Sequence, residues 1–222
     1  MNSIKFWLAS NSPRRREILT WAKWQLKKVP SNVDESMLEM ETPERYVRRI
    51  AELKSGVELK EASAYDFVIS ADTIVALDGK VLGKPKDSQH AFEMLVSMRA
   101  RSHWVMTAIA VRQANSRIAQ FDLCKSPVKM RDYSDEEIRR YVESGDPLDK
   151  AGAYAIQNRD FHPADNFRGC FASVMGLPLC HLERQLRLNP NYDWTDWPAI
   201  CQKKLEYKCP ITSRVMAGED VG

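Results

Sequence analysis

The sequence of 222 residues is poor in glycine and proline and contains no long hydrophobic run. Its 9 glycines and 11 prolines are too few for a low-complexity or fibrous chain, and 44% of its residues are hydrophobic. The apolar stretch 68–77 is interrupted by Ser70, Asp72 and Thr73, so it is too short and too polar to cross a membrane. We therefore expect a globular protein that has one core or two small lobes and no membrane partner.

The beginning of the sequence also lacks the pattern of a secretory signal. Residues 1–10 contain no apolar core of the required length and lead directly into Pro13 and three arginines. We therefore expect a cytoplasmic protein.

Cysteine is scarce, and its spacing does not indicate a disulfide framework. The five cysteines are odd in number and scattered, so we expect reduced and mostly buried thiols. Cys201 and Cys209, with Cys180 and His181 upstream, offer zinc-ligating side chains, but their spacing matches no recognised zinc motif. No Walker loop or dinucleotide-binding glycine fingerprint is present either.

An excess of charge of one sign is also missing from the chain as a whole. The 33 basic and 30 acidic residues leave a net charge of only +3, and this near balance argues against a nucleic-acid partner. Residues 11–30 are different, because they contain six basic side chains and a single acidic one. This local excess suits an anionic ligand, although a solvated basic helix face would look the same.

The order of hydrophobic patterns predicts a mixed α/β fold. Strands are expected over 4–8, 66–77, 103–112 and 117–130 and near 171–175. Helices are expected from Pro13, from Pro43, over 87–98, from Ser134 and from Pro178. A change in amino-acid composition at about residue 189 separates a domain over 1–188 from an extension over 189–222. This extension is either packed on the domain or partly loose.

A turn between the first strand and the first helix has the chemistry of a phosphate site. Ser12 is a good helix cap and Pro13 fits the first helical position. The guanidinium groups of Arg14 and Arg15 can each bind phosphate oxygens, and Ser10 adds a hydroxyl. A capped helix followed by surface arginines is the alternative interpretation.

Asp72 is the strongest candidate for chemistry because it lies within the most apolar predicted strand. A buried carboxylate needs a cation or hydrogen bonds, so it is expected either to hold a divalent metal and activate water or to pair with a core arginine. Glu35 is a weaker acidic candidate in a loop, and Lys54 and Lys84 leave neighbouring elements. Each of these three residues taken alone is more often a solvent-facing charge.

Taken together, these segments resemble the ordered motifs of the Maf family of nucleoside triphosphate pyrophosphatases. The resemblance extends over about residues 4–188. It rests on the segments 8–19, 34–35, Lys54, 71–75, 83–85, 103–107, 149–154, 156–157 and 174–179.

The resemblance implies a fold, a reaction and a set of roles. The implied fold is an elongated mixed β-sheet with flanking helices and a central cleft, similar to the inosine triphosphate pyrophosphatases. The implied reaction converts a nucleoside triphosphate and water to a monophosphate and pyrophosphate with Mg²⁺ or Mn²⁺. By this analogy Asp72 is the general base and a metal ligand, and Glu35 helps to hold the metal. The triphosphate ligands would be Ser10, Arg14, Arg15, Lys54 and Lys84. A homodimer is also expected by analogy with relatives.

Three positions resemble the branch of the family that acts on dTTP and UTP: Arg14, Thr73 and Gln157. The amide of Gln157 offers a donor and an acceptor that complement the edge of a uracil or thymine ring, and Thr73 can add a polar contact. The chain departs from the family at Asn158, where a glycine is usual.

A nucleotide-binding regulatory protein linked to cell division, without significant turnover, is the competing hypothesis. A protein that only binds a triphosphate has no need of a carboxylate beside it, because that charge repels the ligand in the absence of a metal. Asp72 therefore favours the enzyme.

Overall fold

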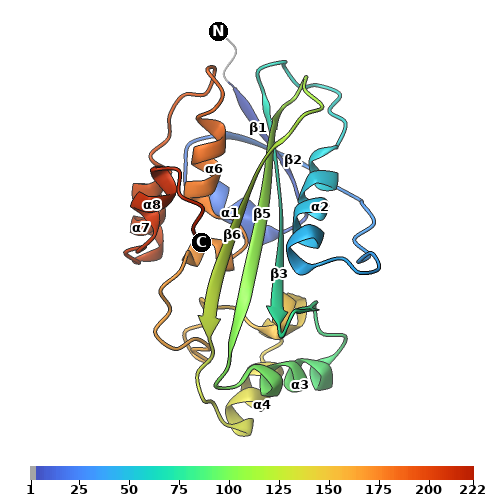
Figure 1. Ribbon diagram of the computed structural model, residues 1–222, viewed down its shortest axis with the longest axis vertical. Helices are drawn as coiled ribbons and strands as arrows, with labels where there is room; N and C mark the ends of the chain where they lie inside the picture. Colours follow the sequence, from blue (N-terminus) through green and yellow to red (C-terminus); the bar gives the residue numbers. More distant parts are fainter. Residues whose placement is uncertain (1–3) are drawn as a thin grey trace.

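The computed structural model describes residues 4–222 and shows an elongated α/β protein (Figure 1). In chain order the elements are β1 (Lys5–Ala9), α1 (Pro13–Leu19), β2 (Gln25–Val29), α2 (Pro43–Ser55), β3 (Phe67–Leu77), β4 (Lys80–Leu82), α3 (Ser88–Met98), β5 (Ser102–Gln113), β6 (Gln120–Lys129), α4 (Asp135–Glu143), the 3₁₀ turns η1 (Asp146–Asp149) and η2 (Ala151–Ala153), α5 (Phe171–Val174), α6 (Leu179–Leu186), α7 (Trp197–Leu205) and α8 (Thr212–Met216).

The strands form one six-stranded mixed sheet. Their order is β2-β1-β3-β5-β6, and β4 pairs with β3 as a short hairpin. β2, β1 and β3 are parallel, whereas β3, β5 and β6 are antiparallel. The mixed sheet with flanking helices confirms the predicted fold class.

Both faces of β3 are buried, because successive side chains along a strand point to opposite sides of the sheet. On one face Phe67 and Ile69 belong to a core that also contains Ile18 of α1, Leu182 of α6 and Trp197 of α7. On the opposite face α2 covers Ile74 and Ala76, and its main contacts are Val47 and Ala51.

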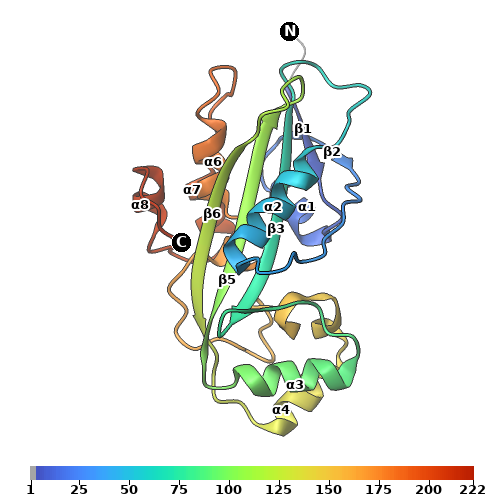
Figure 2. The same ribbon diagram turned by 45° about the vertical axis from the view of Figure 1, so that its right-hand side comes forward.

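The far end of the long strands carries a second lobe. There Val75 and Val105 pack with Leu95 of α3 and Ile138 of α4 in a separate core. Figure 2 shows α3 and α4 grouped at the lower end of the molecule, away from α1, α2 and α6. The sheet therefore connects two packed regions.

The β1-side edge of β3 is unpaired over a short stretch between these regions. β1 pairs with β3 from Phe67 to Ile69, and β4 pairs with it from Val75 to Leu77. Within residues 4–222, the five positions from 70 to 74 have β5 on one side and no strand on the other. Side chains from both faces of β3 can therefore reach the same space at this gap.

Two local predictions are wrong. Residues 171–174 form helix α5 rather than a strand, and the thiol of Cys170 caps it by accepting a hydrogen bond from the Ser173 amide at 3.4 Å. A short apolar run does not distinguish a buried strand from a buried helix by its periodicity. The basic segment also contains a strand, β2, that we do not predict. It lies at the edge of the sheet, where lysines are favoured because they discourage further pairing.

The extension over 189–222 is packed on the domain. The Trp197 side chain is fully buried, and the Tyr192 ring meets the Phe6 ring edge to face with a centroid separation of 6.3 Å. Figure 1 shows α7 and α8 beside α6, on the side away from α2. Within residues 4–222, no helix has the length and apolar character needed to span a bilayer.

Candidate active site

A cavity of about 560 Å³ opens at the unpaired edge of β3. Its walls come from the β1–α1 turn, the loop before α2, the middle of β3, the segment after β4 and the turn after α5. The predicted site residues that line it are Ser10, Arg14, Arg15, Glu35, Lys54, Asp72, Thr73 and Lys84. The gap in the sheet therefore brings together residues that are up to 74 positions apart in the chain.

The floor of the cavity holds an ammonium group between two carboxylates. Lys54 Nζ donates a hydrogen bond to Asp72 Oδ1 at 2.8 Å and forms an ion pair with Glu35 Oε1 at 2.9 Å. Asp72 and Lys54 are each only 7% exposed, whereas the Glu35 side chain is 52% exposed. The Ser70 hydroxyl fixes β3 against α2 by donating to the Ala51 carbonyl at 2.6 Å.

Burial controls the protonation of Asp72 in this cluster. It raises the pKa of the Asp72 carboxyl, and the charges of Lys54 and Arg15 only partly oppose this effect. A carboxylate with a raised pKa is a better proton acceptor than an ordinary aspartate, because its affinity for a proton is greater. Burial thus makes the Asp72 carboxylate more basic than that of an exposed aspartate.

Arg15 is buried, and three of its five N–H groups donate hydrogen bonds within the protein. Its Nε donates to the Gly176 carbonyl at 2.8 Å, Nη2 donates to Thr73 Oγ1 at 2.9 Å, and Nη1 donates to Ser10 Oγ at 3.3 Å. Burial lowers the pKa of the Arg15 guanidinium. These contacts join α1 to β3 and to the turn after α5, so the main action of Arg15 is to hold three segments together.

The hydrogen bond from Arg15 to Thr73 is the first of a row of hydrogen bonds whose donors and acceptors can all be assigned. Thr107 Oγ1 donates to the Ser173 carbonyl at 2.8 Å, so it can only accept from Thr73 Oγ1, which lies 2.9 Å away. Thr73 therefore accepts from Arg15 and donates its single hydrogen to Thr107. Its hydroxyl has no hydrogen left for a nucleobase in this arrangement.

Arg14 and Lys84 line the same cavity and behave differently from Arg15. Arg14 is half-buried and Lys84 is exposed. Within the described part of the chain, neither side chain has an ion-pair partner, whereas Lys150 on the same wall binds Asp149 at 2.6 Å. Arg14 and Lys84 are therefore the cavity cations whose charge is available to an anionic ligand.

Tyr46 is a cavity residue that our sequence interpretation places only in a helix. Its hydroxyl donates to the Glu35 backbone carbonyl at 2.8 Å and so holds the loop that carries this carboxylate. Tyr46, Ile50 and Lys54 lie on one face of α2 because they are four residues apart. That spacing is the signal that could have placed Tyr46 at the site.

Gln157 lies outside the cavity that contains the other predicted site residues. It is exposed in a turn and is not among the residues that line the cavity. The next residue, Asn158, donates from Nδ2 to Asp146 at 3.1 Å and accepts from the Phe161 amide at 2.8 Å, so it fastens this turn to the second lobe. The base-reading role that the resemblance implies for Gln157 stays an untested hypothesis, and the position of the side chain outside the cavity lining argues against it.

The floor of the cavity fits a divalent cation that is shared with phosphate groups. No group of three or more His, Cys, Asp or Glu side chains suited to a metal occurs within residues 4–222. Mg²⁺, however, is commonly bound by one or two carboxylates together with substrate phosphates and water. Glu35 and Asp72 provide two such carboxylates, and both already bind one cationic group, the Lys54 ammonium.

The fold and this cavity together define an α/β protein with an acidic floor and unpaired cations, a site suited to a polyphosphate ligand and a metal. The sequence profile of the Maf-like protein family matches residues 5–188, and the chain belongs to this family.

Proteins that carry the name dTTP/UTP pyrophosphatase are similar over most of their length. The Shewanella denitrificans protein is 44% identical, covering 78% of this chain and 89% of its own. The Dictyoglomus turgidum protein is 41% identical, covering 81% of this chain and 93% of its own. The Neisseria meningitidis protein is 40% identical, covering 81% of this chain and 90% of its own.

Two solved structures show a more distant similarity. The Staphylococcus aureus Ham1 protein matches with a TM-score of 0.40 and 14% identity, over 58% of this chain and 72% of that one. A Mycobacterium abscessus nucleoside-triphosphatase / dITP/XTP pyrophosphatase matches with a TM-score of 0.36 and 12% identity, over 59% and 76%.

Proposed function

We propose that this protein hydrolyses nucleoside triphosphates, with dTTP and UTP as preferred substrates, to the monophosphate and pyrophosphate. The observation that carries the proposal is the buried Asp72–Lys54–Glu35 cluster in the same cavity as the unpaired cations of Arg14 and Lys84. The names of relatives that are 40–44% identical over most of the chain support the reaction and the pyrimidine preference.

The unpaired cations are proposed to bind the triphosphate. Arg14 can hold phosphate oxygens with two parallel hydrogen bonds, and Lys84 can provide a point charge from the opposite segment. Ser10 Oγ accepts from the Ser12 amide at 3.1 Å and can donate its own hydrogen to a phosphate oxygen. We assign Arg15 mainly to positioning, because three of its five N–H groups already donate within the protein.

Asp72 is proposed to take the proton of the attacking water. The water oxygen then bonds to the α-phosphorus, the α–β bridging P–O bond breaks, and pyrophosphate leaves with the electron pair. Lys54 keeps the Asp72 carboxylate in place through its 2.8 Å hydrogen bond, and Glu35 shares the same ammonium. A raised pKa suits Asp72 to this task, because the proton must remain on it while the bond to phosphorus forms.

A divalent cation is proposed to complete the site, with Glu35 and Asp72 as its protein ligands. When bound, such a cation neutralises charge that develops on the phosphate oxygens. The residues of this chain position the carboxylates, hold the water proton and bind the remaining phosphate charge.

The test is a substrate panel with separate detection of both phosphate products. Purified protein is incubated with Mg²⁺ or Mn²⁺ and with dTTP, UTP, CTP or GTP, and pyrophosphate and orthophosphate are measured separately. We expect pyrophosphate in equal amount to the monophosphate, most rapidly from dTTP and UTP. Stepwise release of orthophosphate would contradict the reaction. Tight nucleotide binding without turnover would instead support the regulatory-protein hypothesis.

A further inference from the structure

The wall of the cavity contains a buried lysine that the proposed reaction does not use. Lys150 lies between η1 and η2 and lines the cavity, although only 8% of it is exposed. A backbone hydrogen bond from the Gly152 amide to the Gly83 carbonyl at 3.0 Å joins η2 to the segment that carries Lys84. Lys150 and Lys84 therefore belong to the same wall.

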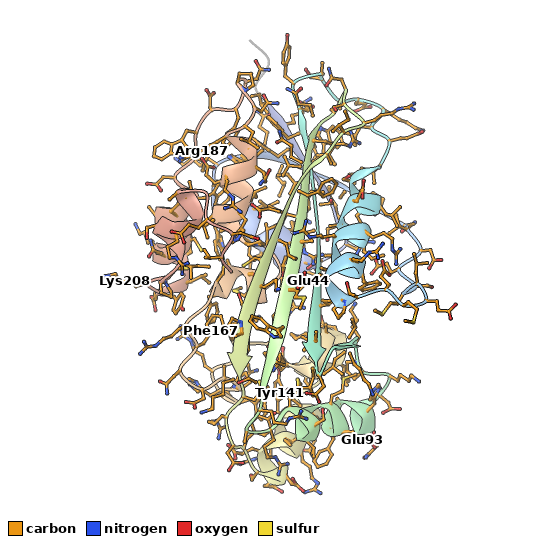
Figure 3. The ribbon with its side chains drawn as sticks, in the orientation of Figure 1. Glu44, Glu93, Tyr141, Phe167, Arg187 and Lys208 are labelled. Atoms are coloured by element: carbon orange, nitrogen blue, oxygen red, sulfur yellow. The ribbon has the colours of Figure 1, made fainter. Side chains whose placement is uncertain are left out.

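Asp146 is the fixed partner of the Lys150 ammonium. The Asp146 backbone carbonyl accepts a hydrogen bond from Lys150 Nζ, and Asp146 Oδ1 lies 2.9 Å from the same nitrogen. Asp146 Oδ2 in turn accepts from the Tyr141 hydroxyl at 2.7 Å and from Asn158 Nδ2 at 3.1 Å. Figure 3 shows Tyr141 in the second lobe, at the lower end of the long strands. The ammonium is thus anchored by a residue that does not itself line the cavity.

Asp149 is the loosely held partner of the same ammonium. Its Oδ1 accepts from Lys150 Nζ at 2.6 Å, but 69% of its side chain is exposed and it lines the cavity. Within residues 4–222, Lys150 is the only residue that binds this carboxylate. Burial by itself would raise the pKa of the Asp149 carboxyl, but the hydrogen bond and charge of Lys150 lower it overall. The charges of Arg14 and Lys84 act in the same direction, as expected for an anion among the cavity cations.

The chemistry of the two partners allows one of them to be exchanged. An ammonium group has three N–H donors, and a phosphate oxygen can replace a carboxylate oxygen as the acceptor of one of them. The bond to Asp149 is the exposed one, and an exposed ion pair contributes little stability because solvent competes with it. A polyphosphate in the cavity can therefore replace Asp149 while Asp146 keeps the ammonium in position.

We propose that the Asp149 carboxylate occupies the position of a phosphate group at the Lys150 ammonium, and that a bound polyphosphate displaces it. Lys150 is then a third cation for the phosphate chain, in addition to Arg14 and Lys84. Asp149 lowers the affinity of the site for every ligand that uses Lys150, because its own bond must first be broken. The proposal rests on the proposed function for the identity of the nucleotide, whereas the anion site itself requires no turnover.

Calorimetric titration with inorganic tripolyphosphate tests the anion site without a nucleobase. Asp149→Asn keeps the size of the side chain and removes its charge. We therefore expect the Kd to fall by about fivefold at low ionic strength and by less at high ionic strength. Asp165→Asn is the matched control, because Asp165 forms a similar ion pair with Lys129 at 2.8 Å but does not line the cavity. An unchanged Kd for Asp149→Asn, or an equal gain for Asp165→Asn, would contradict the proposal.

Lys150→Gln separates displacement from simple charge repulsion. The amide keeps a donor for the Asp146 carbonyl but removes the ammonium, so we expect the Kd for tripolyphosphate to rise by about tenfold. In this background Asp149→Asn should change the Kd by less than about twofold, because no ammonium is left to be released. An equal gain from Asp149→Asn with and without Lys150 would show that Asp149 only repels the ligand, and would overturn the proposal.

A crystal structure of the wild-type protein with tripolyphosphate tests displacement even if Lys150→Gln does not fold. We expect Lys150 Nζ within about 3 Å of a phosphate oxygen and the Asp149 carboxylate beyond hydrogen-bond distance. A complex in which the Lys150–Asp149 bond is intact would overturn the proposal. Hydrolysis of UTP is a separate readout, in which Asp149→Asn should lower KM and leave kcat unchanged. The expected tripolyphosphate results without pyrophosphate release from any nucleotide would refute the proposed reaction but not the anion site.

Discussion

The two faces of β3 use buried polar side chains in opposite ways at the same cavity. On the α2 face, Asp72 and the Lys54 ammonium form a charged cluster that remains open towards Glu35 and solvent. On the α1 face, Thr73 belongs to a row of hydrogen bonds: it accepts from Arg15 and donates to Thr107, which in turn donates to the Ser173 carbonyl.

The difference shows that burial alone does not identify a catalytic residue. A polar group whose hydrogen bonds are all made within the protein stabilises the fold, whereas one with remaining capacity can act on a ligand. Arg14 and Arg15 are neighbours in sequence and illustrate the same contrast: one has no ion-pair partner within residues 4–222, and the other binds three oxygen atoms.

Among the variants considered, Asp72→Asn should have the largest effect on activity, because it changes the charged cluster on the α2 face of β3. The amide cannot take the water proton, so we expect kcat for pyrophosphate release to fall by about 10²–10⁴ while nucleotide binding is largely kept. Steady-state kinetics and calorimetric binding measure the two quantities. Glu44→Gln on α2, outside the residues that line the cavity, is the control and should keep full activity. Near-normal turnover of Asp72→Asn would remove the general-base assignment.

Arg15→Ala should disrupt the hydrogen bonds on the α1 face of β3, and we expect it to lower the stability of the protein. Loss of the guanidinium leaves the Gly176 carbonyl and the Thr73 hydroxyl without their donor, so we expect the free energy of unfolding to fall by about 3 kcal/mol. Thr107→Val interrupts the same row of hydrogen bonds without removing a charge and should cost about 1 kcal/mol, with recovery in Thr107→Ser. Urea denaturation checks all three variants; an unchanged midpoint for Arg15→Ala would contradict the positioning role.

Arg14→Ala should sharpen the contrast between the neighbouring arginines. Because the Arg14 side chain has no ion pair within residues 4–222, we expect the free energy of unfolding to change by less than about 0.5 kcal/mol. The KM for the triphosphate should instead rise by about tenfold, equivalent to ~1.4 kcal/mol, and its dependence on salt should become weaker. Kinetics at low and high ionic strength test this expectation. An unchanged KM at both would return Arg14 to the role of a surface charge.

Gln157→Ala should have the smallest effect, because the side chain is exposed and outside the cavity lining. We expect the specificity constants for UTP, dTTP, CTP and GTP to change by about twofold at most, as is usual for surface positions. A loss confined to UTP and dTTP would restore the base-reading role that the resemblance implies. Loss on all four substrates would instead assign Gln157 to support of the turn.

Much of the fold could be predicted from local patterns. Ser12-Pro13 and Thr42-Pro43 mark the starts of α1 and α2, and Asp78-Gly79 marks the β3–β4 hairpin, because caps and tight turns depend on a few adjacent residues. α5 and β2 could not be predicted in this way. Their short sequences allow more than one conformation, and the neighbouring sheet and core select one of them.

The residues of the site could be named from the sequence, but their partners could not. Asp72 is expected to need a compensating cation, and the structure provides Lys54 from α2 rather than a core arginine. The row of hydroxyl groups through Thr107 is absent from our sequence interpretation, since its directly bonded members are up to 66 positions apart and lie in ordinary strand and helix patterns.

The sequence by itself determined which chemical groups this protein has and where most helices and strands begin, because both depend on residues close together in the chain. The tertiary structure decided which of those groups are free to contact a ligand in the cavity. The unpaired edge of β3 between β1 and β4 admits side chains from both faces to one cavity. Packing of α1 and α5 around that edge engaged three donors of Arg15 and left those of Arg14 without a protein partner within residues 4–222, since hydrogen bonding depends on contacts between distant segments.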